Sequence, residues 1–238
     1  MKNLWNFRGL FKKKEKVNKR KIITISKPKS PISEQYRTIR TNIEYSNIDR
    51  ENRIIMVTSS NPGEGKTITS SNLAVVFSQQ GKKVLLIDAD FRKPMVHDVF
   101  KKQNMFGLTS VIIKHIPLNE AIQETRIKNL YVLTSGPITP SPSELLSSQA
   151  MSELLKTISE QFDLVIIDTP PILPVTDAQI LANQCDGAIL VINCGKTKYE
   201  HAEKAKTLLL NVNARLLGAV LNNIKLNYTD YYYYDDHS

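Results

Sequence analysis

The chain has 238 residues, 41% of them hydrophobic, and a formal net charge of +9. This length and hydrophobic content are enough for one domain with a full core. Residues 1–30 contain eleven Lys and Arg against a single acid, so they carry +10 and leave −1 for the other 208 residues. A basic arm on a nearly neutral body argues against a body that binds nucleic acid along a broad basic face. We expect no specific nucleic acid partner.

Apolar runs and cysteines limit the setting of the protein. The longest uninterrupted apolar runs hold four or five residues, far short of the ~20 needed to cross a bilayer, and the N-terminus lacks the apolar core of a secretory signal. Cys185 and Cys194 form no paired motif, which fits a reducing compartment and offers no metal site. The sequence therefore predicts a cytoplasmic protein without a membrane span.

Composition divides the chain into a Lys-rich arm at 1–30, expected to be flexible, a folded body at 31–227, and a Tyr-rich tail at 228–238, expected to be disordered. In the body, short Ile- and Val-rich runs typical of buried parallel strands alternate with amphipathic helical stretches. We expect strands at 53–58, 84–88, 130–134, 163–168, 187–192 and 216–221, and helices at 65–80, 150–161, 177–184 and 198–211. This alternation predicts an α/β fold with a doubly wound, mostly parallel sheet and a ligand site at the carboxyl ends of its strands.

The first strand runs into a phosphate-loop motif. Against G-x-x-x-x-G-K-[ST], Ser60 stands in place of the first Gly, while Gly65, Lys66 and Thr67 match. Pro62 and the glycines keep the turn tight, so that backbone N–H groups can surround phosphate oxygens. A plain Gly/Pro turn before a helix is the alternative. The motif predicts a P-loop NTPase in which ATP contacts Ser60, Asn61, Pro62, Gly63, Glu64, Gly65, Lys66, Thr67 and Ile68.

Three aspartates follow two later strands. Asp88 and Asp90 end the second strand on one face, and Asp168 ends another strand. Each alone is as readily a turn cap, but three that converge on a phosphate loop favour a Mg²⁺ site, because Mg²⁺ prefers carboxylate and hydroxyl oxygens.

These motifs resemble those of the bacterial tyrosine kinases, a P-loop family unrelated to eukaryotic protein kinases. The resemblance covers about residues 31–238 and rests on PGEGK at 62–66, the A-prime motif at 86–94, the Walker B motif at 165–168 and the terminal tyrosine cluster. It implies an ATP-dependent protein-tyrosine kinase that regulates capsule or exopolysaccharide biosynthesis.

The resemblance also implies roles for individual residues. Lys66 would hold the phosphates, Thr67, Asp90 and Asp168 would organise Mg²⁺, and Asp88 would accept the tyrosine proton. Asn222, at the end of the last strand, would read the adenine ring; a buried turn Asn is the alternative.

The family's oligomerisation motif, E-x-x-R-x-x-R, is matched by Glu34, Arg37 and Arg40. Their spacing places them within ~120° of one helix face. A row of ion pairs within the helix is the plain interpretation, and the resemblance implies a head-to-tail homo-oligomer that closes into a ring.

The tail is the expected substrate, with Tyr228, Tyr231, Tyr232, Tyr233 and Tyr234 as autophosphorylation sites. From residue 227 the chain reaches ~40 Å when extended, enough to enter a neighbouring subunit's site. Autophosphorylation in trans is therefore the expected reaction.

Partners follow from the resemblance. Family members without transmembrane segments resemble the cytoplasmic half of a split kinase. The resemblance implies that a membrane-anchored adaptor recruits them to the inner face of the membrane and activates them. It also implies that they act on protein substrates of polysaccharide synthesis. The basic arm is interpreted either as a tether to anionic lipid or the adaptor, or as a merely solubilising leader.

Two other functions remain open. A partition- or septum-type ATPase shares the fold, but usually carries a Lys at the position of Asn61 and lacks a tyrosine tail. An inactive nucleotide-binding docking module would require Lys66 and the three aspartates to be vestigial.

Overall fold

The computed structural model describes residues 21–46 and 52–224. The predicted tail with its five tyrosines, and residues 1–20 of the predicted arm, lie outside the described residues. No helix within these two described ranges has the length and hydrophobicity needed to span a membrane.

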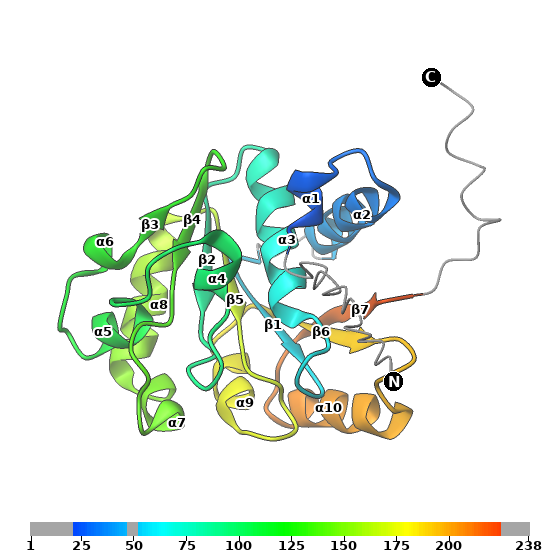
Figure 1. Ribbon diagram of the computed structural model, residues 1–238. Coiled ribbons are helices and arrows are strands. Elements are labelled where there is room, and N and C mark those ends of the chain that lie inside the picture. Colours follow the sequence, from blue (N-terminus) through cyan, green and yellow to red (C-terminus); the bar gives the residue numbers. More distant parts are fainter. Residues whose placement is uncertain (1–20, 47–51, 225–238) are drawn as a thin grey trace, which may run out of the picture.

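The described residues form one seven-stranded sheet in the order β3-β4-β2-β5-β1-β6-β7 (Figure 1). Its strands are β1 (Ile54–Ser59), β2 (Val84–Asp88), β3 (Gln123–Glu124), β4 (Leu130–Leu133), β5 (Leu164–Asp168), β6 (Gly187–Asn193) and β7 (Leu216–Asn222). Only the short edge strand β3 pairs antiparallel among these seven. The predicted doubly wound, mostly parallel α/β sheet is confirmed, and each predicted strand is present within one residue at either end.

Helices cover both faces of the sheet (Figure 1). The four predicted helices are α3 (Lys66–Gln79), α8 (Gln149–Gln161), α9 (Asp177–Ala182) and α10 (Tyr199–Asn211), and the oligomerisation motif lies on α2 (Pro31–Tyr45). Short elements that hydrophobic periodicity did not indicate are α1 (Ile23–Ser26), α4 (Val96–Phe100), α5 (Leu108–Ile112), α6 (Leu118–Ala121) and α7 (Pro142–Leu146).

Successive strand residues point to opposite faces and so divide the core in two. In β1, Ile55 and Val57 pack under α1, α2 and α3, whereas Met56 packs under α5, α8, α9 and α10. The central strands β1, β2 and β5 are buried on both faces, which explains why their sequences are continuous apolar runs rather than alternating ones.

Residues 22–30 of the predicted arm contact the folded body. Ile22 is buried, and the N–H and the hydroxyl of Thr24 both donate to Asn72 Oδ1 on α3, at 3.0 and 2.9 Å. Ser33 Oγ donates to the Lys27 carbonyl oxygen at 2.7 Å. Residues 22–30, which composition assigned to the arm, therefore belong to the folded body.

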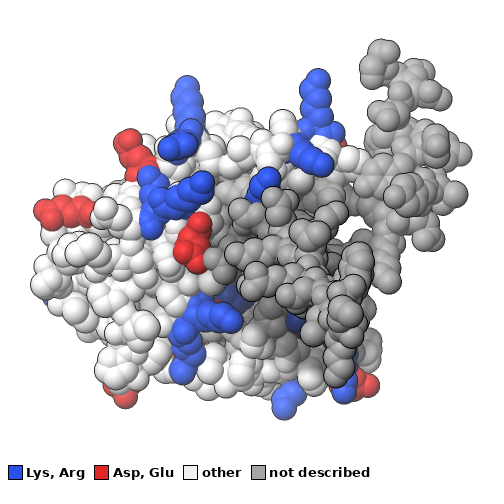
Figure 2. Space-filling view, viewed as in Figure 1, with Lys and Arg blue, Asp and Glu red and all other residues white. Residues whose placement is uncertain are grey.

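The face seen in Figure 2 carries charges of both signs. Figure 2 shows Lys and Arg side chains scattered over one face of the molecule, with acidic side chains between them.

Candidate active site

The phosphate loop connects β1 to α3 and depends on its glycines. Gly63 and Gly65 have φ of +77° and +100°, the left-handed region that other residues rarely adopt. Gly65 is the N-cap of α3, so Lys66 begins the helix. The unpaired N–H groups and the positive dipole end of a 14-residue helix favour an anion at this loop.

Asn222 braces the loop from the end of β7. Its Nδ2 donates to the carbonyl oxygen of Glu64 at 2.9 Å, and its Oδ1 accepts from the N–H of Asn223 at 2.9 Å. A Cβ on Gly65 would lie 2.1 Å from Asn222 Nδ2. Asn222, predicted either to read adenine or to be a buried turn Asn, is half-buried and supports the phosphate loop; its adenine role stays a prediction.

A second brace reaches the loop from the segment after β6. Glu64 is 1% exposed, and its Oε1 accepts from Thr197 Oγ1 at 2.6 Å and from Asn61 Nδ2 at 3.2 Å. Thr197 Oγ1 in turn accepts from the N–H of Asn193 at 3.0 Å. Sequence reasoning missed Thr197, because no motif marks it and only the parallel pairing of β1 with β6 brings it to the loop.

Lys66 lies among the predicted carboxylates. Its Nζ is 2.7 Å from Asp90 Oδ2 and 3.9 Å from Asp168 Oδ2, and its side chain is 10% exposed. Burial alone would lower the pKa of Lys66, but the charges of Asp168 and Asp90 outweigh burial and raise it. The lysine therefore stays charged throughout the physiological range.

Asp88 is held by backbone donors. Its Oδ2 accepts from the N–H groups of Met95 and Val96, each at 2.9 Å, and its Oδ1 accepts from the N–H of Asp90 at 3.2 Å. Burial first, and then the charge of Asp168, raise the pKa of Asp88 to about 7. A carboxylate with this pKa can take up a proton near neutral pH.

Asp168 has the surroundings of a cation ligand. It pairs with Asp88 in the β2–β5 register, and both of its carboxylate oxygens are buried without a hydrogen-bond partner among the described residues. Burial raises its pKa, although the Lys66 charge opposes the rise. The described ranges contain no group of three or more His, Cys, Asp or Glu set to hold a metal ion, so a cation here would need hydroxyl, water or phosphate oxygens as well.

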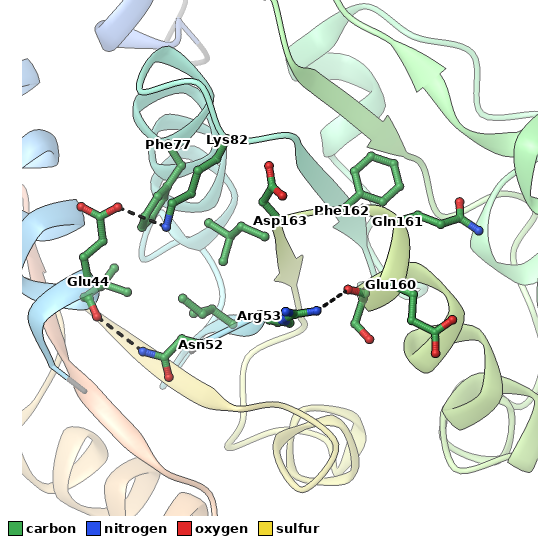
Figure 3. A pocket seen from close by; sticks show the side chains of 13 residues that line it. Glu44, Asn52, Arg53, Phe77, Lys82, Glu160, Gln161, Phe162 and Asp163 are labelled. Atoms are coloured by element: carbon green, nitrogen blue, oxygen red, sulfur yellow. Dashed lines mark hydrogen bonds and ion pairs between the residues drawn. The ribbon is translucent and has the colours of Figure 1, made fainter. Parts of the chain in front are cut away.

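A separate hollow of about 520 Å³ lies at the amino ends of the strands (Figure 3). Its charged side chains contact one another or the backbone: Lys82 Nζ is 3.2 Å from Glu44 Oε1, and Arg53 Nη1 donates to the Ser159 carbonyl oxygen at 3.4 Å. No predicted site residue lines it. The carboxyl ends of β1, β2 and β5 are therefore the candidate active site.

The oligomerisation motif is only partly on the surface. Arg37 forms an ion pair with Glu34, as the plain interpretation predicted, and its Nη2 donates to the Pro28 carbonyl oxygen at 2.9 Å. Arg40 turns inward, where its Nη1 donates to the Val76 carbonyl oxygen of α3 at 3.0 Å. Glu34 and Arg37 are thus the more accessible members of the motif.

Comparison with known proteins decides the family. The family described as AAA domain matches residues 52–226. Tyrosine-protein kinase YwqD of Bacillus subtilis is 56% identical over 216 residues, which cover 90% of this chain and 91% of that protein. The chain belongs to the bacterial tyrosine kinase family.

Solved structures agree with this assignment. The crystal structure of the chimerical protein CapA2B2 matches the kinase with a TM-score of 0.84 at 41% identity, over 86% of this chain and 90% of that one. The septum-site-determining protein MinD of Pyrococcus horikoshii, complexed with Mg-ADP, matches with a TM-score of 0.62 at 27% identity, over 72% and 70% of the two chains. The kinase therefore shares its fold with P-loop ATPases and a closer likeness with tyrosine kinases.

Proposed function

We propose that the kinase transfers a phosphoryl group from ATP to tyrosines of its own C-terminal tail, with the tail of one subunit entering the site of another. The observation that carries the proposal is the contact of Lys66 with Asp90 and Asp168 at a glycine-shaped phosphate loop, in a chain 56% identical to a tyrosine-protein kinase. The tyrosines Tyr228, Tyr231, Tyr232, Tyr233 and Tyr234 are the proposed acceptors.

The site provides the groups that this reaction needs. Backbone N–H groups of residues 60–68, Pro62 excepted, bind the phosphates, and the Lys66 ammonium neutralises charge as it develops on the transferred group. Asp88 accepts the proton of the attacking phenol. Since the phenol pKa is near ~10, Asp88 mainly orients the hydroxyl until charge develops on its oxygen.

Mg²⁺ fits the donor set as a cofactor with ATP. Thr67, Asp90 and Asp168 are the proposed protein ligands, and the burial of both Asp168 carboxylate oxygens beside the Lys66 ammonium supports the assignment. When bound with ATP, the cation would supply positive charge against that of the phosphates. The Mg-ADP complex of the structurally similar MinD is consistent with this choice.

Transfer of label from γ-labelled ATP tests the proposal. The proteins are the wild type, Lys66→Met, a chain ending at Asn227, and a variant with the five tail tyrosines changed to Phe. Label on tyrosine that needs Lys66 and is lost in both tail variants supports the kinase. Lys82→Met, which removes an exposed lysine remote from the site, is the matched control.

A P-loop ATPase is the second candidate, favoured by the likeness to MinD. Phosphate release without label on the protein would support it and overturn the kinase proposal. Because we propose that a membrane-anchored adaptor activates the kinase, the assay is run with and without the cytoplasmic tail of a cognate adaptor.

Assembly and cellular role complete the proposal. Glu34 and Arg37 would contribute to a head-to-tail contact that closes a ring of subunits. The ring would act at the inner face of the membrane on protein substrates of capsule or exopolysaccharide synthesis. Light scattering of wild type and Glu34→Ala/Arg37→Ala tests the ring; an unchanged mass would contradict it.

A further inference from the structure

Arg92 belongs to the loop that carries Asp90, and its guanidinium contacts a buried acid. Arg92 Nε donates to Asp177 Oδ2 at 2.8 Å, and Arg92 Nη2 donates to Asp177 Oδ1 at 3.1 Å. Two parallel N–H···O bonds make this a bidentate pair, which fixes orientation as well as distance.

Asp177 is buried and depends on Arg92 as a partner for its charge. It is the first residue of α9 and is 0% exposed, so its charge depends on partners inside the protein. Its Oδ1 also accepts from Ser143 Oγ at 2.7 Å. Ser143 lies inside α7, whose N-cap is Ser141.

These contacts connect the three loops that follow β2, β4 and β5. The β5 loop lies against the phosphate loop, because the N–H groups of Ile172 and Leu173 donate to the carbonyl oxygens of Ser59 and Ser60, at 2.9 and 3.3 Å. α7, which follows the β4 loop, packs on α9. Arg92 therefore ties the Asp90 loop to a part of the fold already fixed against the phosphate site.

The loop between Asp88 and α4 has local support as well. The N–H of Lys93 donates to Asp90 Oδ1 at 2.9 Å. Because Lys93 directly follows Arg92, a shift of Arg92 would move this donor and disturb the Asp90 carboxylate. Phe91, between Asp90 and Arg92, packs in the hydrophobic core, and Arg92 adds a polar side-chain contact from this loop to α9.

We propose that Arg92, Asp177 and Ser143 form a clamp that positions Asp90 against Lys66, and that Arg92 is a positioning residue of the kinase rather than a phosphate ligand. The inference rests on the proposed function for its activity readout only. Groups that orient a metal or phosphate ligand typically contribute about 10–100-fold to metal affinity or activity.

The test uses full-length Arg92→Ala, Arg92→Lys, Asp177→Asn and the double variant Arg92→Ala/Asp177→Asn. Each is assayed for kcat and KM of tyrosine labelling, and separately for the Mg²⁺ concentration that half-saturates binding of a fluorescent ADP. Lys93→Ala removes a charge from the same loop without touching the clamp and is the control. Thermal unfolding shows that each protein is folded at the assay temperature.

We expect Arg92→Ala and Asp177→Asn each to lower kcat and to raise the Mg²⁺ requirement by about tenfold or more, with KM for ATP changed much less. Arg92→Lys should be nearly as impaired, because an ammonium cannot form the bidentate pair. The double variant should be no worse than the more impaired single variant, because both remove one interaction.

Three results would overturn the clamp. Full activity of Asp177→Asn beside an inactive Arg92→Ala would make Arg92 a direct phosphate or peptide ligand, as would rescue by Arg92→Lys. A loss of the same size in Lys93→Ala would assign the effect to loop charge. If the wild type labels no tyrosine but the clamp variants still raise the Mg²⁺ requirement, the proposed function fails and the clamp stands.

Discussion

Lys66 Nζ lies 2.7 Å from Asp90 Oδ2, so the lysine of the phosphate loop is also the counter-charge of the aspartates around it. Removing one partner of a buried ion pair leaves an uncompensated charge and costs about 3–5 kcal/mol. Exposed pairs contribute at most about 1 kcal/mol. The two kinds of lysine in this protein should therefore respond differently to the same substitution.

Lys66→Met is expected to lower the free energy of unfolding by about 3 kcal/mol at pH 8, as well as to abolish labelling. Lys82→Met, whose partner is Glu44 at 3.2 Å on the surface, should lose less than about 1 kcal/mol. Urea unfolding of both variants and the wild type measures the difference. Equal losses would show that the aspartates do not depend on Lys66 for compensation.

The pH dependence of stability should identify Asp88. Its pKa of about 7 in the folded protein lies above the ordinary ~3.9 of an unfolded Asp. Between these values the folded state binds the proton more tightly than the unfolded state, so the ionisation of Asp88 opposes folding as pH rises from about 4 to 7. Above pH 7 the penalty is complete and constant.

Asp88→Asn removes this ionisation, so the stability of wild type minus that of Asp88→Asn should fall between about pH 5 and 7.5 and then level off. Urea unfolding in a chelator across that range gives the curve. Glu160→Gln, an exposed change on α8, should give a flat difference. A flat curve for Asp88→Asn as well would mean that Asp88 ionises normally.

Sequence reasoning recovered the elements that long apolar patterns define. Six strands and four helices, and the meeting of Asp88 with Asp168, followed from runs such as 84–88 and from the geometry of parallel sheets. These features depend on local patterns and on one rule of topology.

What escaped prediction depends on tertiary partners. Thr24 joins the body because Asn72 of α3 accepts its N–H and hydroxyl, although Lys-rich composition placed it in an arm. Ser143 has the chemistry of a cap, but its hydroxyl is drawn to buried Asp177. The sequence places Arg40 on the surface of a helix, but its guanidinium donates to a carbonyl oxygen of α3. In each case a distant residue competes with the local preference.

Glu64 should affect ATP binding in two opposite ways, through the hydrogen bonds that order the phosphate loop and through its negative charge. Its carboxylate braces Thr197 and Asn61 but places a buried negative charge in the loop that is proposed to bind phosphates. Glu64→Gln keeps an oxygen for both donors and removes the charge, so it should tighten ATP binding by about 1 kcal/mol, or about fivefold. Glu64→Ala and Thr197→Val lose the brace and should weaken it. Calorimetric titration decides; weaker binding by Glu64→Gln would show that the charge itself is needed.

Gly65→Ala should disable the phosphate loop for two reasons that can be separated. An L residue at φ +100° costs about 1 kcal/mol, and the new Cβ would lie 2.1 Å from Asn222 Nδ2. Gly81→Ala meets nothing within 4 Å at φ +104°, so it reproduces the backbone cost alone.

We expect Gly65→Ala to weaken ATP binding by tenfold or more, about 1.4 kcal/mol, and Gly81→Ala to lower stability by about 1 kcal/mol with ATP binding unchanged. The double variant Gly65→Ala/Asn222→Ala relieves the contact and should recover part of the affinity, whereas affinity as low as that of Gly65→Ala would place the defect in the backbone of the loop rather than in its contact with β7.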